Sequence, residues 1–140
     1  MAMQTRVERV DAVVPITVMA LDGELDASNY LRLVDDVKEL YAAGTRHLLL
    51  DLSDLSFIAS SGLVALFSVV KVMSGEEPPD PEFGWGAFHQ VSRGVEEGGE
   101  IQAAVQLCCA QSSVKDVLER TGLDRIFRSH PDRDTALAAF

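Results

Sequence analysis

The hydrophobic pattern changes its period in the middle of the chain. Residues 48–52 form an apolar run broken only by an aspartate, which is typical of a strand covered on both faces of a parallel sheet. The polar residues from 51 to 56 then predict a turn of the chain, and Phe57 and Ile58 are expected to form a buried anchor. From Ser60 onward the apolar residues recur at helical spacing. We therefore expect a strand, a turn and a helix that begins near Ser60.

Two strands and a helix are predicted before this unit. Residues 5–10 are typical of a short edge strand, and residues 15–21 predict a second strand that Asp22-Gly23 follows as a turn or bulge signal. Asp26 is expected to cap a helix that ends at Gly44. The apolar face of that helix consists of Tyr30, Leu33, Val34, Val37, Leu40 and Tyr41.

The last forty residues repeat the alternation of strand and helix. Residues 101–109 alternate in polarity as a strand does, and residues 113–116 have the spacing of a capping box that opens a helix ending at Gly122. Residues 126–127 are compatible with a last short strand, and Asp132 is expected to cap a terminal helix. The order of elements predicts an α/β fold with a mixed sheet of four to five strands and helices packed on it.

A segment of different composition interrupts this pattern at about residues 74–97. Three of the five prolines in the chain lie there, so the second helix cannot continue through it. We interpret the segment as an insertion, after the start of the second helix, in a single domain that spans residues 1–140. Its aromatic cluster, Phe83, Trp85 and Phe88, either packs back onto the domain or presents a contact surface.

Composition limits the class of protein. The 140 residues, 47% of them apolar and 24% charged, suit one soluble globular domain. No apolar run approaches the ~20 residues that span a bilayer, and no signal-peptide segment is visible, which predicts a cytoplasmic protein. Adjacent Cys108 and Cys109 have neither metal-ligand spacing nor a disulfide framework, which favours a reducing compartment.

The net charge narrows the kinds of partner. A charge of −10, with basic residues spread along the chain, argues against a nucleic-acid surface. This charge suits a basic protein partner, or it serves only to keep the protein soluble.

The strand-to-helix junction is the strongest candidate for chemistry. The first turn of a helix has unpaired N–H groups and roughly half a positive charge, so a phosphoryl group on Ser60 would be stabilised there. Alternatively, Ser60 or Ser61 is only the N-cap. Gly62 fits both interpretations, because a residue without a Cβ allows backbone or a partner to approach closely.

Enzyme and metal chemistry have weaker support. Ser60 lacks the Gly-x-Ser-x-Gly elbow, and no histidine is paired with it. Asp51 and Asp54 could bind Mg²⁺, but the sequence offers no third ligand. We therefore predict no catalytic residue, no metal site and no cofactor. His47, His89 and His130 are expected at the surface.

Three segments resemble the STAS domain, the sulfate transporter and anti-sigma factor antagonist family. Residues 20–26 (Ala-Leu-Asp-Gly-Glu-Leu-Asp) are similar to its second-strand signature. Residues 50–63, from Leu-Asp-Leu-Ser through Ser-Ser-Gly-Leu, look like its central motif, and residues 113–127 look like its third-helix segment. The resemblance extends over nearly the whole chain except about 74–97.

The resemblance implies a bacterial anti-sigma factor antagonist that takes part in transcription regulation. In that family the unphosphorylated antagonist binds an anti-sigma factor, a histidine-kinase-like serine kinase, and a phosphatase reverses the phosphorylation. The matching phosphoacceptor in this chain is Ser60, and the family pattern usually has an acidic residue before it where this chain has Ala59. The implied partner-binding residues are Asp26, Phe57, Ile58, Ala59, Ser60, Ser61 and Gly62.

A STAS module that does not switch is the alternative. Such a module would be a scaffold in a signalling complex or the adaptor subunit of a transporter. Ala59 favours this alternative, because a module that is never phosphorylated needs no kinase-recognition residue. The sequence leaves the oligomeric state open, with a dimer as one option.

Overall fold

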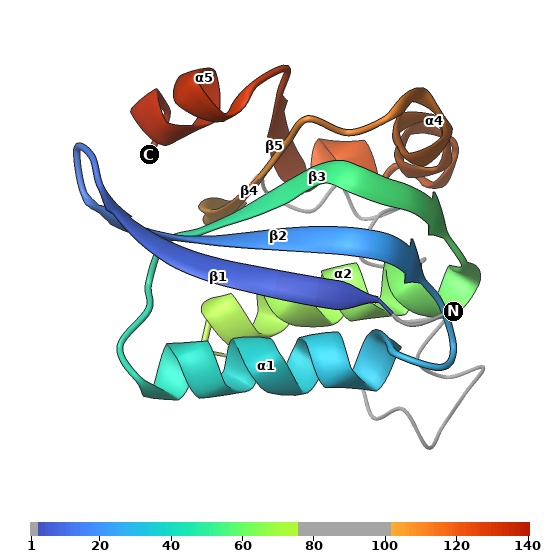
Figure 1. The fold of residues 1–140 in the computed structure, drawn as a ribbon, viewed down its shortest axis with the longest axis horizontal. Coiled ribbons are helices and arrows are strands. Elements are labelled where there is room, and N and C mark those ends of the chain that lie inside the picture. The colour runs from blue at the N-terminus through green and yellow to red at the C-terminus, as the bar shows by residue number, and fades with distance from the viewer. Residues whose placement is uncertain (1–2, 76–101) are drawn as a thin grey trace.

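The computed structural model describes residues 3–75 and 102–140, in which five strands form one mixed sheet in the order β1-β2-β3-β4-β5. β1 (Gln4–Asp11) is antiparallel to β2 (Pro15–Leu25). β3 (Leu48–Ile58), β4 (Gln102–Cys108) and β5 (Phe127–His130) continue the sheet in parallel. Figure 1 shows this sheet with helices on both faces. The predicted α/β fold is confirmed.

Helices cover the two faces of the sheet unequally. α1 (Tyr30–Ala42) and α2 (Ser60–Met73) lie together along one face, and the short α5 (Arg133–Ala138) lies on the other (Figure 1). α4 (Ser112–Thr121) lies beside the end of β3 and is followed by the 3-10 turn η2 (Leu123–Arg125). All four predicted helical regions that fall within the described residues are therefore present.

The apolar residues of β3 supply both cores. Leu48 and Leu50 belong to the large core beneath α1 and α2, whereas Leu49 belongs to a small core beneath α5. All three side chains are fully buried, which confirms a strand covered on both faces. The small core also contains Ile16, Val18, Cys108 and Ala136.

The predicted turn at residues 51–56 is wrong, because β3 runs on to Ile58. Its register against β2 shifts twice, so that β3 has one residue more than β2 in each interval. Across these bulges the apolar residues of the strand recur every third position, at Leu52, Leu55 and Ile58, and all three are buried. The polar residues between them are exposed within a strand rather than in a loop.

β2 is also longer than expected, because Asp22 and Gly23 lie inside the strand at the bulged register and not in a turn. Asp26 is not the cap of α1. That position belongs to Asn29, whose side chain is buried and donates to the Glu24 carbonyl at 2.7 Å. Asn29 Oδ1 also accepts from the Asp26 N–H at 3.0 Å, so Asn29 holds the connection between β2 and α1.

Of the remaining predictions about helix ends, some are confirmed and one is wrong. Gly44 and Gly122 have positive φ after α1 and α4, as expected of helix stops. The capping box at Ser113 is wrong, since Gln111 is the N-cap of α4 and Ser113 Oγ donates instead to the Ser56 carbonyl at 3.2 Å. Asp132 does cap α5, accepting the Thr135 N–H at 2.7 Å.

The insertion predicted at about 74–97 lies outside the described residues from position 76 onward, as do Phe83, Trp85, Phe88 and His89. α2 ends where this segment begins, at Met73, with Ser74 as its C-cap. Within residues 3–75 and 102–140, every helix is too short or too polar to traverse a lipid bilayer.

Candidate functional site

The candidate site is the junction of β3 and α2, where Ser60 is the first residue of the helix. Ala59 occupies the N-cap position with extended backbone angles, φ −83° and ψ 171°, and no side chain caps the helix. The prediction that Ser60 or Ser61 is the N-cap is therefore wrong. Ser60 is exposed and Ser61 is half-buried in the first turn.

Packing against the end of β2 fixes the start of α2 in place of a side-chain cap. The Ala59 N–H donates to the Leu25 carbonyl at 2.9 Å, and the Ala59 carbonyl accepts from Gly62 and Leu63. Gly62 is buried so tightly that a Cβ would lie 2.9 Å from the Leu25 carbonyl oxygen and from side-chain atoms of Leu25 and Ile58. The close approach expected at Gly62 thus involves the backbone of the neighbouring strand.

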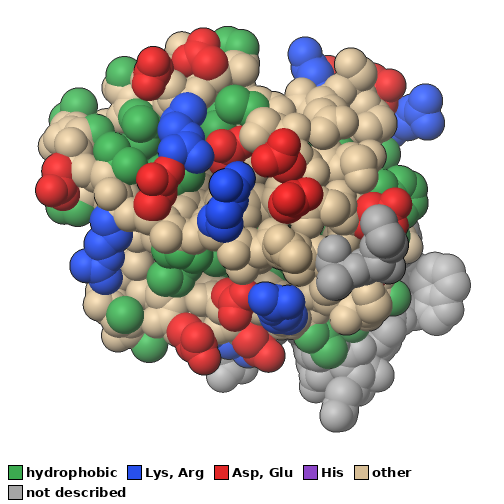
Figure 2. Space-filling model, in the orientation of Figure 1, with side chains coloured by type: hydrophobic (Ala, Val, Ile, Leu, Met, Phe, Trp, Pro, Cys, Tyr) green, Lys and Arg blue, Asp and Glu red, His purple; other side chains and the backbone are tan. Residues whose placement is uncertain are grey.

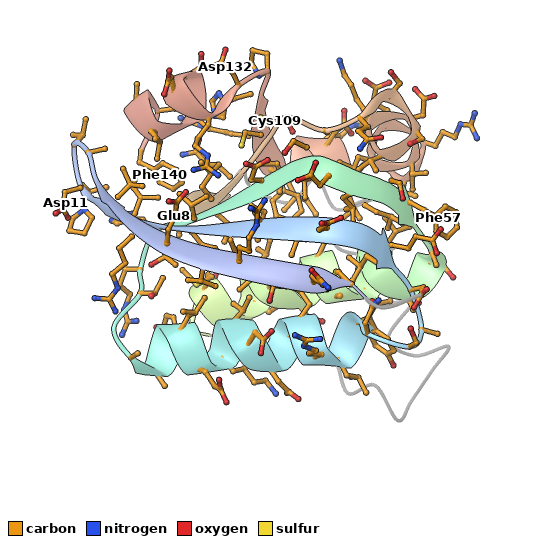
Figure 3. All side chains as sticks on the ribbon, viewed as in Figure 1. Glu8, Asp11, Phe57, Cys109, Asp132 and Phe140 are labelled. Atoms are coloured by element: carbon orange, nitrogen blue, oxygen red, sulfur yellow. The ribbon has the colours of Figure 1, made fainter. Side chains whose placement is uncertain are left out.

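Two exposed side chains mark the surface of this junction. Phe57 was expected to be buried, but half of its surface is exposed, and Figure 3 shows it at the end of β3 beside the start of α2. Ile58 points the other way, into the large core. Phe57 and Ile58 are adjacent in a strand and therefore point to opposite faces, and at this end of β3 only Ile58 meets a core. Phe57 and Ser60 remain available to a partner.

Asp26 adjoins the junction, one residue beyond Leu25. Its Oδ1 accepts from the Ser28 hydroxyl at 2.6 Å and from the Ser28 N–H at 2.9 Å, and these bonds lower the pKa of Asp26. The seven residues expected to bind a partner therefore come together at one end of the sheet. Asp26, Ala59 and Ser61 are half-buried there, whereas Ile58 and Gly62 are buried.

The electrostatics of the first turn favour an anion. No acidic residue lies in the first turn of α2, and no side chain competes for its N–H groups. An uncapped helix N-terminus presents unpaired donors and the positive end of the helix dipole. A phosphoryl group on Ser60 would meet both, so the geometry is compatible with an anionic modification at this residue.

A second polar cluster, which the sequence did not reveal, lies on the sheet face covered by α5. Arg133 donates to Asp51 Oδ2 at 2.9 Å and also pairs with Glu8. Burial would raise the pKa of Asp51, but the Ser53 N–H and the Arg133 guanidinium outweigh it and hold that pKa below its usual value. The bond to Asp51 in turn raises the pKa of Arg133.

The Mg²⁺ pair considered from the sequence is not assembled as such. Asp54 pairs with Arg6 at 3.6 Å, while Asp51 pairs with Arg133, so the two carboxylates have different partners. Within the described residues, the one group of three possible metal ligands is Asp51, Cys108 and Cys109.

Two of the histidines are less exposed than expected. His130 is half-buried, with its Nε2 2.6 Å from the side-chain oxygen of buried Gln106. His47 packs edge-on against Phe140 with ring centroids 5.9 Å apart.

Figure 2 shows acidic and basic side chains interspersed on the visible face, with no large area of a single sign.

The comparison with family models matches this junction and the elements before it. The STAS domain model matches residues 5–75, which include β1 except for its first residue, together with β2, α1, β3 and α2. The comparison with curated proteins found no match.

Solved structures share the fold at low identity. An anti-sigma factor antagonist from Mycobacterium paratuberculosis is 22% identical, with a TM-score of 0.68, over 99% of this chain and 93% of that one. The Thermotoga maritima protein tm1081 is 21% identical, with a TM-score of 0.68, over 95% and 91% of the two chains. The Bacillus cell fate determinant SpoIIAA in its phosphorylated form is 15% identical, with a TM-score of 0.57, over 96% of each chain.

Proposed function

Since the chain belongs to the STAS domain family, we propose that it is an anti-sigma factor antagonist whose partner binding is switched by phosphorylation of Ser60. In its unphosphorylated form it would bind an anti-sigma factor and so free the sigma factor. The anti-sigma factor would be a histidine-kinase-like serine kinase, and a phosphatase would restore the binding form. The similarity to an anti-sigma factor antagonist and to a protein solved in a phosphorylated form supports this proposal.

The observation that carries the proposal is the position of Ser60. Its side chain is exposed at the first residue of α2, which has no side-chain cap. A kinase can therefore reach the hydroxyl without unfolding the helix. Once attached, the phosphoryl group would accept hydrogen bonds from the free N–H groups of the first turn.

Phe57 explains how this modification would affect binding. Its half-exposed ring is an apolar contact at the end of β3, and aromatic residues are common anchors of protein interfaces. A partner that covers Phe57 would also cover the start of α2. Two negative charges on Ser60 would then have to lose water inside the interface, which costs on the order of several kcal/mol without a matching cation.

The first test identifies the phosphoacceptor. The protein is incubated with ATP and a histidine-kinase-like anti-sigma factor from the same organism, and the modified residue is mapped by mass spectrometry. We expect phosphate on Ser60, its loss in Ser60→Ala, and normal incorporation in the matched variant Ser61→Ala. Phosphate on Ser53, Ser56 or Ser61 with none on Ser60 would contradict the proposal.

The second part of the test measures the switch. The same anti-sigma factor is titrated with wild type, Ser60→Ala and Ser60→Asp, and with Ser61→Asp as a charge control. We expect Ser60→Ala to bind like wild type and Ser60→Asp to bind roughly ten- to hundredfold more weakly. Equal binding by Ser60→Asp and Ser60→Ala would exclude a charge switch and favour a non-switching interaction module.

A further inference from the structure

The strongest unexplained feature outside the Ser60 junction is the arrangement of Asp51, Cys108 and Cys109. One ligand atom from each side chain lies within 4.8 Å of the others. Asp51 is the register partner of Cys108 on the adjacent strand, which brings these two side chains to the same face of the sheet. Figure 3 shows Cys109 in the region between the sheet and α5.

The backbone at Cys109 explains why both thiols join this group. Adjacent residues of a regular strand point to opposite faces of a sheet. Cys109, however, has φ +63°, the one positive φ among the described residues other than glycine, and its N–H donates to the His130 carbonyl at 3.0 Å. Both cysteines consequently pack on the small core beneath α5.

The donor atoms select a class of ion. Two thiolates are soft ligands and one carboxylate is a hard ligand. Zn²⁺ and similar borderline cations accept this mixture, whereas Mg²⁺ and Ca²⁺ prefer oxygen alone. Three protein ligands leave the fourth tetrahedral position for water or another small ligand.

The surroundings of Asp51 fit the outer shell of such a site. Each of its carboxylate oxygens already accepts one hydrogen bond, Oδ1 from the Ser53 N–H at 3.0 Å and Oδ2 from Arg133 at 2.9 Å. Ligating carboxylates are commonly oriented in this way, and each oxygen keeps a lone pair. A divalent cation would offset much of the negative charge of two thiolates and Asp51, in addition to the Arg133 guanidinium that Asp51 shares with Glu8.

A groove next to the cluster offers a way in. It has a volume of about 420 Å³ and is lined by β1 and β2 residues and by Arg133. One lining residue, Ala20, is the register partner of Asp51. An ion in this groove would therefore be one strand away from the cluster.

We propose that Asp51, Cys108 and Cys109 bind one thiophilic divalent cation of the Zn²⁺ type, with an open fourth position. Binding has to remove the thiol protons, and burial raises the pKa of Cys108, so part of the binding energy is used for deprotonation. This site lies where β3 pairs with the end of β4, whereas Ser60 is the first residue of α2, and it does not depend on the proposed switch.

The test uses the full chain, purified metal-free under reducing conditions, with Co²⁺ and Zn²⁺ as probes. We expect one Co²⁺ per chain with the thiolate-to-cobalt charge-transfer absorption, and displacement of Co²⁺ by Zn²⁺. Cys109→Ser should weaken Zn²⁺ binding at least about tenfold. Even the loss of a residue that only hydrogen-bonds to a metal ligand weakens binding by about ten- to hundredfold. Asp54→Asn, a carboxylate on the same strand outside the cluster, should leave it unchanged.

Two results would overturn the proposal. One is Co²⁺ binding by wild type without thiolate absorption, because ordinary surface carboxylates or histidines would then be the ligands. The other is Zn²⁺ binding of wild-type strength in Cys109→Ser. Since Cys109 is only half-buried and serine is nearly isosteric, circular dichroism should confirm that this variant is folded.

Discussion

The helices α2 and α5 begin in different ways. α5 has an aspartate at its N-cap, and Asp132 accepts the Thr135 N–H at 2.7 Å. α2 has Ala59 at the same position and no side-chain bond to its first turn. The start of α2 is held by its contact with the end of β2, through the Ala59 N–H and the buried Gly62. The start of α5 is capped by the side chain of Asp132, while the start of α2 is fixed by packing and has no side-chain cap on its first turn.

The comparison shows what stabilises a helix that has no side-chain N-cap. Loss of an N-cap usually costs about 1 kcal/mol, so an uncapped helix needs another source of stability. α2 has that source, since ten of its fourteen residues are buried, against one of six in α5. A well-buried helix can leave its N–H groups for a ligand, whereas a short peripheral helix cannot.

The largest change in the free energy of unfolding is expected when a Cβ is added at Gly62. Alanine in a helix is ordinarily about 1 kcal/mol better than glycine, but this Cβ would meet a backbone oxygen at 2.9 Å, which cannot rotate away. Overpacking costs about 1–3 kcal/mol, so we expect Gly62→Ala to lower the free energy of unfolding by about 1–2 kcal/mol. Urea titration measures this, and Ser61→Ala is the control, expected within about 0.5 kcal/mol of wild type. A more stable Gly62→Ala would mean that packing does not fix the start of α2.

A smaller effect of opposite sign is expected from giving α2 a cap. Ala59 has the extended backbone of a normal N-cap, so Ala59→Ser should raise the free energy of unfolding by about 1 kcal/mol. Ala43→Ser, at the exposed C-cap of α1, is the matched control and should give no gain. Urea titration of both variants and of wild type measures this difference in stability. Equal stability of the two variants would show that the first turn of α2 is already satisfied.

The smallest effect is expected when low pH protonates Asp132 and weakens the N-cap of α5. The hydrogen bond from the Thr135 N–H lowers the pKa of Asp132, so the cap is fully formed above the unfolded pKa of aspartate. It is lost as the pH falls through the lower pKa of the folded state. We expect amide exchange in α5, corrected for the intrinsic pH dependence, to increase in this range, with no matching change at the start of α2. Asp132→Asn should remove the pH dependence, and the control Asp134→Asn should keep it. A parallel increase at both helices would show general loosening instead.

The fold was largely predictable because most elements obey local rules. The apolar run at 48–52, the helical spacing from Leu63 to Val70 and the glycines 44 and 122 all act through neighbours in sequence. β3 was predicted too short because its two bulges depend on pairing with β2, which changes the apolar period from two to three. No local sequence pattern predicts such a register shift, because it depends on how the two strands pair.

The candidate site was predictable in position and less so in detail. The change of period placed the helix start at Ser60, as found. Whether Ser60 or Ala59 is the N-cap depends on one backbone conformation, and the exposure of Phe57 depends on the phase of a bulged strand. The bond from Arg133 to Asp51 joins residues 82 positions apart, so sequence spacing could not reveal it.

The ion pair between Glu8 and Arg133 joins residues 125 positions apart, and the small core beneath it needs Ala136 to be complete. A ribosome therefore has to release all of the residues between Glu8 and Ala136 before this face of the sheet can close. Until α5 emerges, Ile16, Val18 and Leu49 are apolar residues on an uncovered surface. Exposed apolar surface of this kind is what chaperones bind and what drives aggregation of nascent chains. In the cell, the chance of misassembly should thus be highest before α5 has left the ribosome and packed on this face of the sheet.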